Sequence, residues 1–340
     1  MVYIKGGLMV DFKKILIIRT GAIGDVIHTT NTFRAIKEAH PEVEIHYLTA
    51  IDTMLLEFDK NIAKVWSIKD KQLKVFSKYM KEYAQLLKAE NFDAVINLQP
   101  SVKLRMLATL AGIKHQFNYE KNPKHHAVMN YWETAKKAFP DIRQYSDLKM
   151  YLSEEVSEKM KNELSQYRKP LVVLNAGHVF AKRQGRTYPI EKWIELGNKI
   201  QEKYNGTIVI TGVKADCEVL KPLEAIPNTV SYVDKLTLEE NSALIKNVDM
   251  LISGDSGPLH IAAALGVKAV GLFGSMPISR FRPCGRNCSV VLSPMKCAPC
   301  DHIRCKYLRG SKDLYSPCMK LIETDDIMLE IDKLFDSGHI

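Results

Sequence analysis

The sequence lacks the long apolar run of a membrane-spanning helix, since none of its hydrophobic stretches reaches the ~18 residues that crossing a bilayer requires. Residues 1–10 also lack the apolar core and the small-residue cleavage site of a signal peptide. We therefore expect a cytoplasmic protein. The cysteines agree with that location: there are seven, an odd number, and a disulfide framework is not expected in a large cytoplasmic chain.

Two kinds of binding motif are also missing. No strand-like run is followed by the G-x-G-x-x-G turn that holds a dinucleotide, which counts against a nicotinamide-dependent oxidoreductase. No nucleic-acid-binding motif is present, and the basic residues are scattered. The chain does carry 48 Lys and Arg against 39 Asp and Glu, a formal net charge of +9. This excess indicates either anionic partners, such as phosphates, an acidic glycan or a membrane surface, or simply a basic surface.

Apolar β-branched runs alternate with amphipathic stretches, and this pattern predicts parallel sheets with helices on both faces. The alternation begins at Lys14, weakens between residues 141 and 169, and starts again at Leu171. Because 340 residues comfortably form two cores, we predict an α/β protein of two doubly wound, Rossmann-like domains, residues 1–150 and 151–340. Predicted strands cover residues 14–19, 44–49, 65–68, 94–98, 115–118, 171–175 and 207–211, with 250–253 and 269–273 as the last two; predicted helices cover 26–40, 72–90, 190–204 and 259–265.

A glycine-rich turn, Thr20-Gly21-Ala22-Ile23-Gly24-Asp25, follows the first predicted strand. Turns of this kind expose backbone N–H groups at the positive end of a helix dipole. The carboxylate of Asp25 would repel a pyrophosphate, however, so this turn is not expected to hold one. Two interpretations of Asp25 remain. It is either the N-cap of the following helix or a general base at the edge of the sheet, where open α/β folds bind ligands.

A second turn, Ser253-Gly254-Asp255-Ser256-Gly257-Pro258, joins a buried strand to a helix. Pro258 suits the first turn of a helix, while Ser256 and Gly257 offer hydroxyl and N–H donors to a ligand. His260 follows within the same turn of helix and faces the same edge. Together these residues predict an anion site. For His260 taken alone, a histidine that only caps the helix is the alternative.

A third strand end, Asn175-Ala176-Gly177-His178, leads into a loop with three cations, Lys182, Arg183 and Arg186. Such a loop either neutralises a leaving diphosphate or is simply a solvated basic loop. Asp216 lies beyond the end of the next predicted strand. An acid in that position can accept hydrogen bonds from ribose hydroxyls.

The first two turns resemble the motifs of glycosyltransferase family 9, the ADP-heptose:lipopolysaccharide heptosyltransferases. The first motif is Arg19-Thr-Gly-Ala-Ile-Gly24-Asp25-Val-Ile-His28-Thr, and the second is Ser253-Gly-Asp255-Ser-Gly-Pro-Leu-His260. The resemblance spans nearly the whole chain, with each motif in the expected half. It implies a GT-B architecture, in which two Rossmann-like domains face a central cleft, the acceptor on the N-terminal domain and the nucleotide sugar on the C-terminal domain.

The resemblance also implies the reaction, a metal-independent transfer of a heptose, with inversion, from ADP-heptose to a lipopolysaccharide inner-core acceptor. No cofactor is then required for catalysis, and the enzyme works in the cytoplasm, in peripheral contact with the inner face of the inner membrane. The family's proposed base falls on Asp25. Tyr188 stands where the family usually has tryptophan, and the loop before it looks longer than usual, so Lys182 or Arg183 is an alternative phosphate ligand. The expected donor-binding residues are Gly177, Lys182, Arg186, Asp216, Asp255, Ser256, Gly257 and His260.

A cysteine cluster lies near the C-terminus, in the arrangement C-x2-C-x4-C-x12-C formed by Cys297, Cys300, Cys305 and Cys318. Four thiolates with a tight leading pair can close a tetrahedral structural site for zinc or iron. Such a site leaves no open coordination position for catalysis. The alternative is a set of reduced, buried cysteines without a metal.

Three other functions are open at this point. A glycosyltransferase that uses another nucleotide sugar, or another acceptor such as a protein, would carry the same turns. A nucleotide-binding oxidoreductase would share two Rossmann-like domains, although its dinucleotide turn is missing. A binding protein without activity would not need Asp25 and His260, and their presence counts against it.

Overall fold

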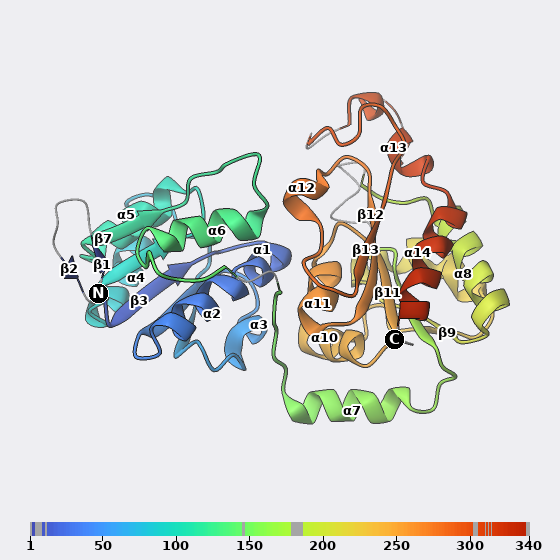
Figure 1. The fold of residues 1–340 in the computed structure, drawn as a ribbon, viewed down its shortest axis with the longest axis horizontal. Coiled ribbons are helices and arrows are strands. Elements are labelled where there is room, and N and C mark those ends of the chain that lie inside the picture. The colour runs from blue at the N-terminus through green and yellow to red at the C-terminus, as the bar shows by residue number, and fades with distance from the viewer. Residues whose placement is uncertain are drawn as a thin grey trace. The chain divides into compact units, whose positions relative to one another are not determined.

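The computed structural model describes residues 2–3, 9–10, 12–144, 147–177, 186–301, 305–309, 311, 313 and 315–337. Two compact units divide the chain, Met1–Tyr151 and Leu152–Ile340. Each unit has its own parallel sheet with helices around it (Figure 1). The predicted α/β class with Rossmann-like sheets is therefore confirmed.

In chain order, the first unit contains β1 (Val2–Tyr3), β2 (Met9–Val10), β3 (Lys14–Ile18), α1 (Ile23–His28), α2 (Thr30–Ala39), β4 (Glu44–Thr49), α3 (Met54–Glu57), β5 (Lys64–Ser67), α4 (Lys78–Ala89), β6 (Ala94–Asn97), α5 (Val102–Leu110), β7 (His115–Asn118) and α6 (Ala127–Lys136). Its sheet has the order β5-β4-β3-β6-β7, with all strands parallel. The strand order reverses between β3 and β6. The carboxyl ends of the strands on either side of such a reversal form the usual ligand site of an open α/β sheet.

Helices cover both faces of this first sheet. The helices α4 and α5 pack together, and α6 packs with α1 and α2. Under α4 and α5, aliphatic side chains of the strands, such as Leu16 and Val95, meet Leu87 and Leu104 of the helices. Because the central strands β3 and β6 are buried on both faces, they read in the sequence as apolar runs rather than as alternating ones.

The second unit contains α7 (Glu154–Leu164), β8 (Leu171–Asn175), α8 (Ile190–Tyr204), β9 (Thr207–Ile210), η2 (Lys214–Asp216), α9 (Cys217–Leu220), η3 (Lys221–Ala225), β10 (Thr229–Ser231), α10 (Leu238–Lys246), β11 (Met250–Gly254), α11 (Gly257–Leu265), β12 (Lys268–Phe273), α12 (Ile278–Phe281), β13 (Cys288–Leu292), η4 (Lys306–Leu308), α13 (Pro317–Lys320) and α14 (Thr324–Asp336). Its parallel sheet has the order β10-β9-β8-β11-β12-β13. The order reverses between β8 and β11. Of the helices around this sheet, α8 packs with α14, and α10 packs with α11 (Figure 1).

Two predicted helices differ from those observed. The predicted helix 26–40 is two helices, α1 and α2, which meet at Thr29. The Thr29 hydroxyl donates to the Val26 carbonyl at 2.7 Å and bonds to the Tyr47 hydroxyl at 2.9 Å, and these two bonds hold the break between the helices. The predicted helix 72–90 begins only at residue 78. Ser77 caps it by accepting a hydrogen bond from the Met80 N–H at 3.2 Å, and the residues before Ser77 form turns.

The prediction that residues 250–253 and 269–273 form the last two strands is wrong, since β13 follows them at the edge of the sheet. The prediction also omitted β10, whose three residues are too few to show a pattern. Among the described residues, none of the helices combines the length and the apolar character needed to span a membrane.

Candidate functional site

Asp25 is the third residue of α1 and lies just beyond the carboxyl end of β3. Its Oδ1 accepts a hydrogen bond from the Tyr131 hydroxyl at 3.0 Å, and its Oδ2 forms an ion pair with Arg19 Nη2 at 2.5 Å. The Ala22 N–H also donates to Oδ2, at 3.2 Å, so Asp25 does help to start its helix, although it is not the N-cap residue. With 24% of its side chain exposed, the fixed carboxylate stays accessible to a reactant.

Tyr131 and Arg19 hold this carboxylate in place. Burial, followed by the charge of Asp25, raises the pKa of Tyr131 well above its usual value, so its hydroxyl remains a donor at physiological pH. Arg19 lies over the Tyr131 ring, 5.4 Å from its centroid, and donates to the Leu98 carbonyl at 3.2 Å. Burial acts to lower the pKa of Arg19, but electrostatic interactions with Tyr131 and Asp25 outweigh burial and raise it. Asp25 is therefore oriented beside a permanent cation.

Neither partner of Asp25 is among the site residues predicted from the sequence. Arg19 stands within the first motif, and a cation directly after a buried strand was a usable signal. Tyr131 comes from α6, 106 residues away from Asp25, and no local pattern links the two residues.

The second predicted turn follows the carboxyl end of β11, beside β8, where the strand order of the second sheet reverses. α11 begins at Gly257, with Pro258 in its first turn as predicted. The Ser256 hydroxyl does not cap this helix, because it bonds to Ser253 Oγ at 2.7 Å and accepts from Asn175 Nδ2 at 3.1 Å. Within the described chain, α11 thus has no side-chain cap, and its positive end is open to an anion.

Asn175 joins the two strand ends beneath this turn, a role that the sequence reasoning missed. It pairs in register with Ser253 on the neighbouring strand, and its Nδ2 donates to Ser253 Oγ at 2.8 Å. Its second hydrogen bond, to Ser256 Oγ, fixes the residue that precedes α11. A polar amide at the end of an otherwise apolar strand was the available signal.

Arg186 lies beside the same turn. Its Nη1 pairs with Asp255 Oδ2 at 3.3 Å, and Asp255 Oδ1 lies 3.5 Å from His260 Nε2, so Asp255 orients both side chains. Burial lowers the pKa of Arg186, although Asp255 and Asp301 act in the opposite direction. Arg186 Nε is buried and has no hydrogen-bond partner among the described residues. Because an unpaired buried donor on a cation is costly, this geometry suits an anionic ligand next to Arg186.

Gly177 and Asp216 meet just beyond the ends of β8 and β9. A Cβ at residue 177 would lie 2.8 Å from Asp216 Oδ2, so the missing side chain of Gly177 permits this close approach. Asp216 is buried, and its Oδ2 accepts a hydrogen bond from the Val213 N–H at 3.3 Å. The structure thus brings these two predicted residues together at the same edge of the second sheet as the Asp255 turn.

Lys182 and Arg183, the predicted phosphate ligands of the basic loop, lie outside the described residues. Tyr188 belongs to the core of the second unit. Its ring packs edge-to-face against Trp193, with 5.4 Å between centroids, and its hydroxyl donates to the Ile322 carbonyl at 3.1 Å. Tyr188 therefore contributes to packing rather than to contact with a ligand.

The cysteines of the predicted metal site are free thiols, with Cys318 buried and Cys297, Cys300 and Cys305 half-buried. Burial raises the pKa of Cys318, and the negative charge of Cys305, Cys300 or Cys297 as a thiolate would act in the same direction, so each of these three cysteines lies within electrostatic reach of Cys318. The Cys300 N–H donates to the Ser275 carbonyl at 3.1 Å, which ties this region to the end of β12. In the described part of the chain, however, no group of three or more His, Cys, Asp or Glu side chains is placed to hold a metal ion. The cysteines gather, but they do not form a closed site.

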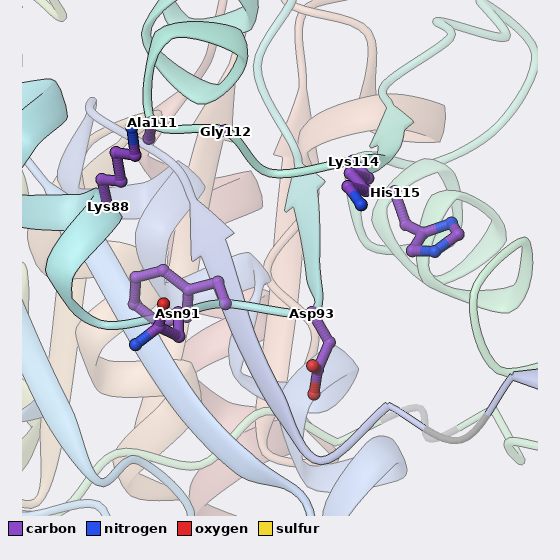
Figure 2. Close-up of a pocket in the computed structure, with 8 residues that line it drawn as sticks. Lys88, Asn91, Asp93, Ala111, Gly112, Lys114 and His115 are labelled. Atoms are coloured by element: carbon purple, nitrogen blue, oxygen red, sulfur yellow. The ribbon is translucent and has the colours of Figure 1, made fainter.

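A cavity of about 360 Å³ lies at the opposite edge of the first sheet from Asp25 (Figure 2). Its lining comes from the ends of α4 and α5 and from the residues at the amino ends of β6 and β7. None of the predicted site residues lines it. The lining residues are Lys88, Asn91, Phe92, Asp93, Ala111, Gly112, Lys114 and His115.

Comparison with known proteins links these features to one family. The sequence model of glycosyltransferase family 9 (heptosyltransferase) matches residues 80–309, a range that includes the Asp255 turn and Arg186 but begins after Asp25. A curated relative, lipopolysaccharide heptosyltransferase 1 of Campylobacter coli, is 24% identical over 358 residues, which cover 95% of this chain and 99% of the relative.

Solved structures share the fold along almost the whole chain. The glycosyltransferase family 9 structure from Veillonella parvula superimposes with a TM-score of 0.78 at 18% identity, covering 96% of this chain and 98% of that one. The ADP-heptose lipopolysaccharide heptosyltransferase II of Escherichia coli gives a TM-score of 0.76 at 17% identity, covering 96% and 100%. These matches confirm the GT-B fold class.

Proposed function

The chain belongs to glycosyltransferase family 9, and from that membership we propose that it transfers a heptose, with inversion, from ADP-heptose to an inner-core sugar of lipopolysaccharide. The relative in Campylobacter coli, which is a lipopolysaccharide heptosyltransferase, aligns over 95% of this chain and supports the proposal. The two polar strand ends, one in each unit, supply the two kinds of group that the reaction needs. One group takes a proton, and the other neutralises a leaving diphosphate.

The donor diphosphate binds, in this proposal, at the start of α11. The observation that carries this assignment is Arg186, whose buried Nε has no partner among the described residues and lies beside an uncapped helix N-terminus. Ser256, Gly257 and His260 line the same turn, while Asp255 keeps Arg186 and His260 oriented. Gly177 and Asp216 serve the ribose on the neighbouring strand ends, and Lys182 is a further phosphate ligand.

Asp25 acts as the general base. The acceptor hydroxyl oxygen attacks the anomeric carbon of the heptose from the face opposite the diphosphate, and the bond from that carbon to the diphosphate oxygen breaks. Asp25 takes the proton of the hydroxyl, and ADP leaves with the bonding electron pair. The cation of Arg186 and the helix dipole of α11 offset the charge that develops on the diphosphate.

Thermal denaturation with different nucleotides tests the donor assignment. A ligand that binds only the folded state raises the melting temperature. We expect ADP to raise it, and UDP, GDP and NAD to have little effect. A rise in melting temperature with UDP or GDP but not with ADP would indicate another nucleotide sugar. A rise with NAD but not with ADP would contradict a transferase.

We further propose that Cys297, Cys300, Cys305 and Cys318 bind one structural zinc or iron ion, by closing around it from the region in which they already gather. Elemental analysis of purified protein is expected to find about one ion per chain, because four thiolates complete a tetrahedral site. Cys297→Ser/Cys300→Ser should remove the ion. The matched control, Cys217→Ser in α9, should retain it, and metal content unaffected by the double substitution would contradict this proposal.

The place of action also belongs to the proposal. A lipopolysaccharide acceptor is carried by a lipid, so we place the enzyme in the cytoplasm, in peripheral contact with the inner face of the inner membrane. The net charge of +9 supports attraction to an anionic membrane surface.

A further inference from the structure

The segment that follows β5 exposes large apolar side chains next to lysines. Phe76 is 67% exposed and Val75 is 48% exposed. The backbone of Phe76 has a φ of 59°, in the left-handed region that bulky residues rarely adopt. Packing within the fold does not account for an exposed aromatic ring on such a backbone, so this residue points to a contact outside the chain.

This segment is anchored at the carboxyl edge of the first sheet. It leaves the carboxyl end of β5, and Leu73 holds it to the core under α4 and α5. Lys103, at the start of α5, binds Asp70 twice, with its Nζ 2.8 Å from Oδ1 and 3.2 Å from the carbonyl oxygen. Val102, which is 75% exposed, precedes that lysine. Asp25 follows β3 in the same parallel sheet, so the apolar side chains and the base lie at one edge.

The charges around the apolar side chains are mainly positive. Lys69, Lys71 and Lys74 are all exposed, whereas the single acid among residues 69–76, Asp70, is paired with Lys103. We call residues 69–76 together with Val102 the basic rim. A projecting aromatic ring among lysines is typical of surfaces that bind anionic bilayers, because the ring enters the interface while the cations meet the headgroups.

We propose that the basic rim docks this enzyme on an anionic phospholipid bilayer, with Phe76 inserted at the headgroup boundary. The inference rests on the proposed function, since an acceptor carried by a lipid must be met at a membrane. Docking through this edge of the sheet brings Asp25 toward the sugar that the membrane carries. The interaction weakens as ionic strength rises, because its charged part is screened.

Vesicle binding by the purified full chain tests the proposal. The variant Lys74→Glu/Phe76→Ser removes a cation, adds an anion and deletes the ring. It is expected to bind phosphatidylcholine vesicles that contain phosphatidylglycerol at least roughly tenfold more weakly than the unaltered chain. Both residues are exposed, so the melting temperature should not change.

The matched control lies at the other end of α4, near the opposite edge of the sheet. Leu86→Ser/Lys88→Glu makes the same kinds of change at two exposed residues and is expected to alter vesicle binding by less than about twofold. Equal losses in both variants would show that net charge alone governs binding and would overturn the proposal. Failure of the unaltered chain to bind these vesicles, or binding to polyglutamate instead, would overturn it as well.

This assay contains neither nucleotide sugar nor acceptor. Its outcome is therefore independent of heptose transfer, which is measured separately on a delipidated, soluble acceptor. If the proposed function is wrong, transfer fails with the unaltered chain while vesicle binding persists. If only the docking inference is wrong, transfer proceeds and the basic-rim variant binds vesicles as the unaltered chain does.

Discussion

Asp25→Asn is expected to lower turnover by roughly two to four orders of magnitude while leaving the affinity for ADP unchanged. The amide keeps the shape of the side chain but cannot accept the proton of the acceptor hydroxyl. ADP affinity should hold because the base belongs to the first unit, whereas the proposed diphosphate ligands belong to the second. Steady-state kinetics together with calorimetric titration of ADP measure the two quantities.

Tyr131→Phe is the informative comparison for this variant. It removes the hydrogen bond to Asp25 Oδ1 but keeps the ring under Arg19 and the carboxylate itself. Turnover should therefore fall less than in Asp25→Asn. Because only the orientation of the Asp25 carboxylate changes, the affinity for ADP should stay the same. A loss of ADP affinity in Asp25→Asn would contradict the assignment, because it would place this residue on the donor side.

Arg186→Ala is expected to weaken ADP binding by about ten- to a hundredfold, in line with the loss of one charge-assisted interaction. The catalytic efficiency for the nucleotide sugar should fall further, because the same cation stabilises the leaving diphosphate. Without Arg186, the Asp255 carboxylate also remains close to the phosphates with one fewer cation to offset it. Calorimetry with ADP and kinetics at varied donor concentration measure these effects.

Arg168→Ala provides the control for Arg186→Ala. It removes an arginine of the same unit that lies before β8, at the amino edge of the sheet, where its Nη1 donates to Asn205 Oδ1 at 2.8 Å. Net charge falls equally in both variants. If ADP affinity is unchanged in Arg186→Ala, or falls equally in Arg168→Ala, the diphosphate does not bind where we propose.

The centre of each sheet was predictable because strands such as β3, β6, β8 and β11 are buried on both faces. A continuous apolar run set the limits of β8 as observed, and the amphipathic pattern of α8 gave both of its ends. The predicted limits of β4 and β7 also match, although both strands include polar residues and β7 is only half-buried. The helix break at Thr29 was not predictable, because the hydroxyl of Tyr47 that helps to hold it lies 18 residues further along the chain. β13 was missed because its apolar run, residues 290–292, is short and the strand is only partly buried at the edge of the sheet.

The candidate site was likewise predictable only in part. The sequence alone locates Asp25 and the Asp255–His260 segment. Glycine, serine and proline at a strand-to-helix turn are favoured by the local backbone and so can be recognised without the fold. Of the residues that orient Asp25 and this segment, Tyr131 acts across the fold and carries no local signal of that role. Asn175 carries only a weak one, a polar amide at the end of an apolar strand, which does not reveal its partner Ser256.

Incubation of the purified chain with ADP-heptose and a lipopolysaccharide that lacks heptose tests the central claim most directly. Mass spectrometry of the acceptor, with ADP measured in parallel, follows both products. The proposed function predicts that the acceptor gains heptose in step with the release of ADP, and that Asp25→Asn gains almost none. An acceptor that stays unmodified with ADP-heptose but gains a sugar from another nucleotide donor would contradict it.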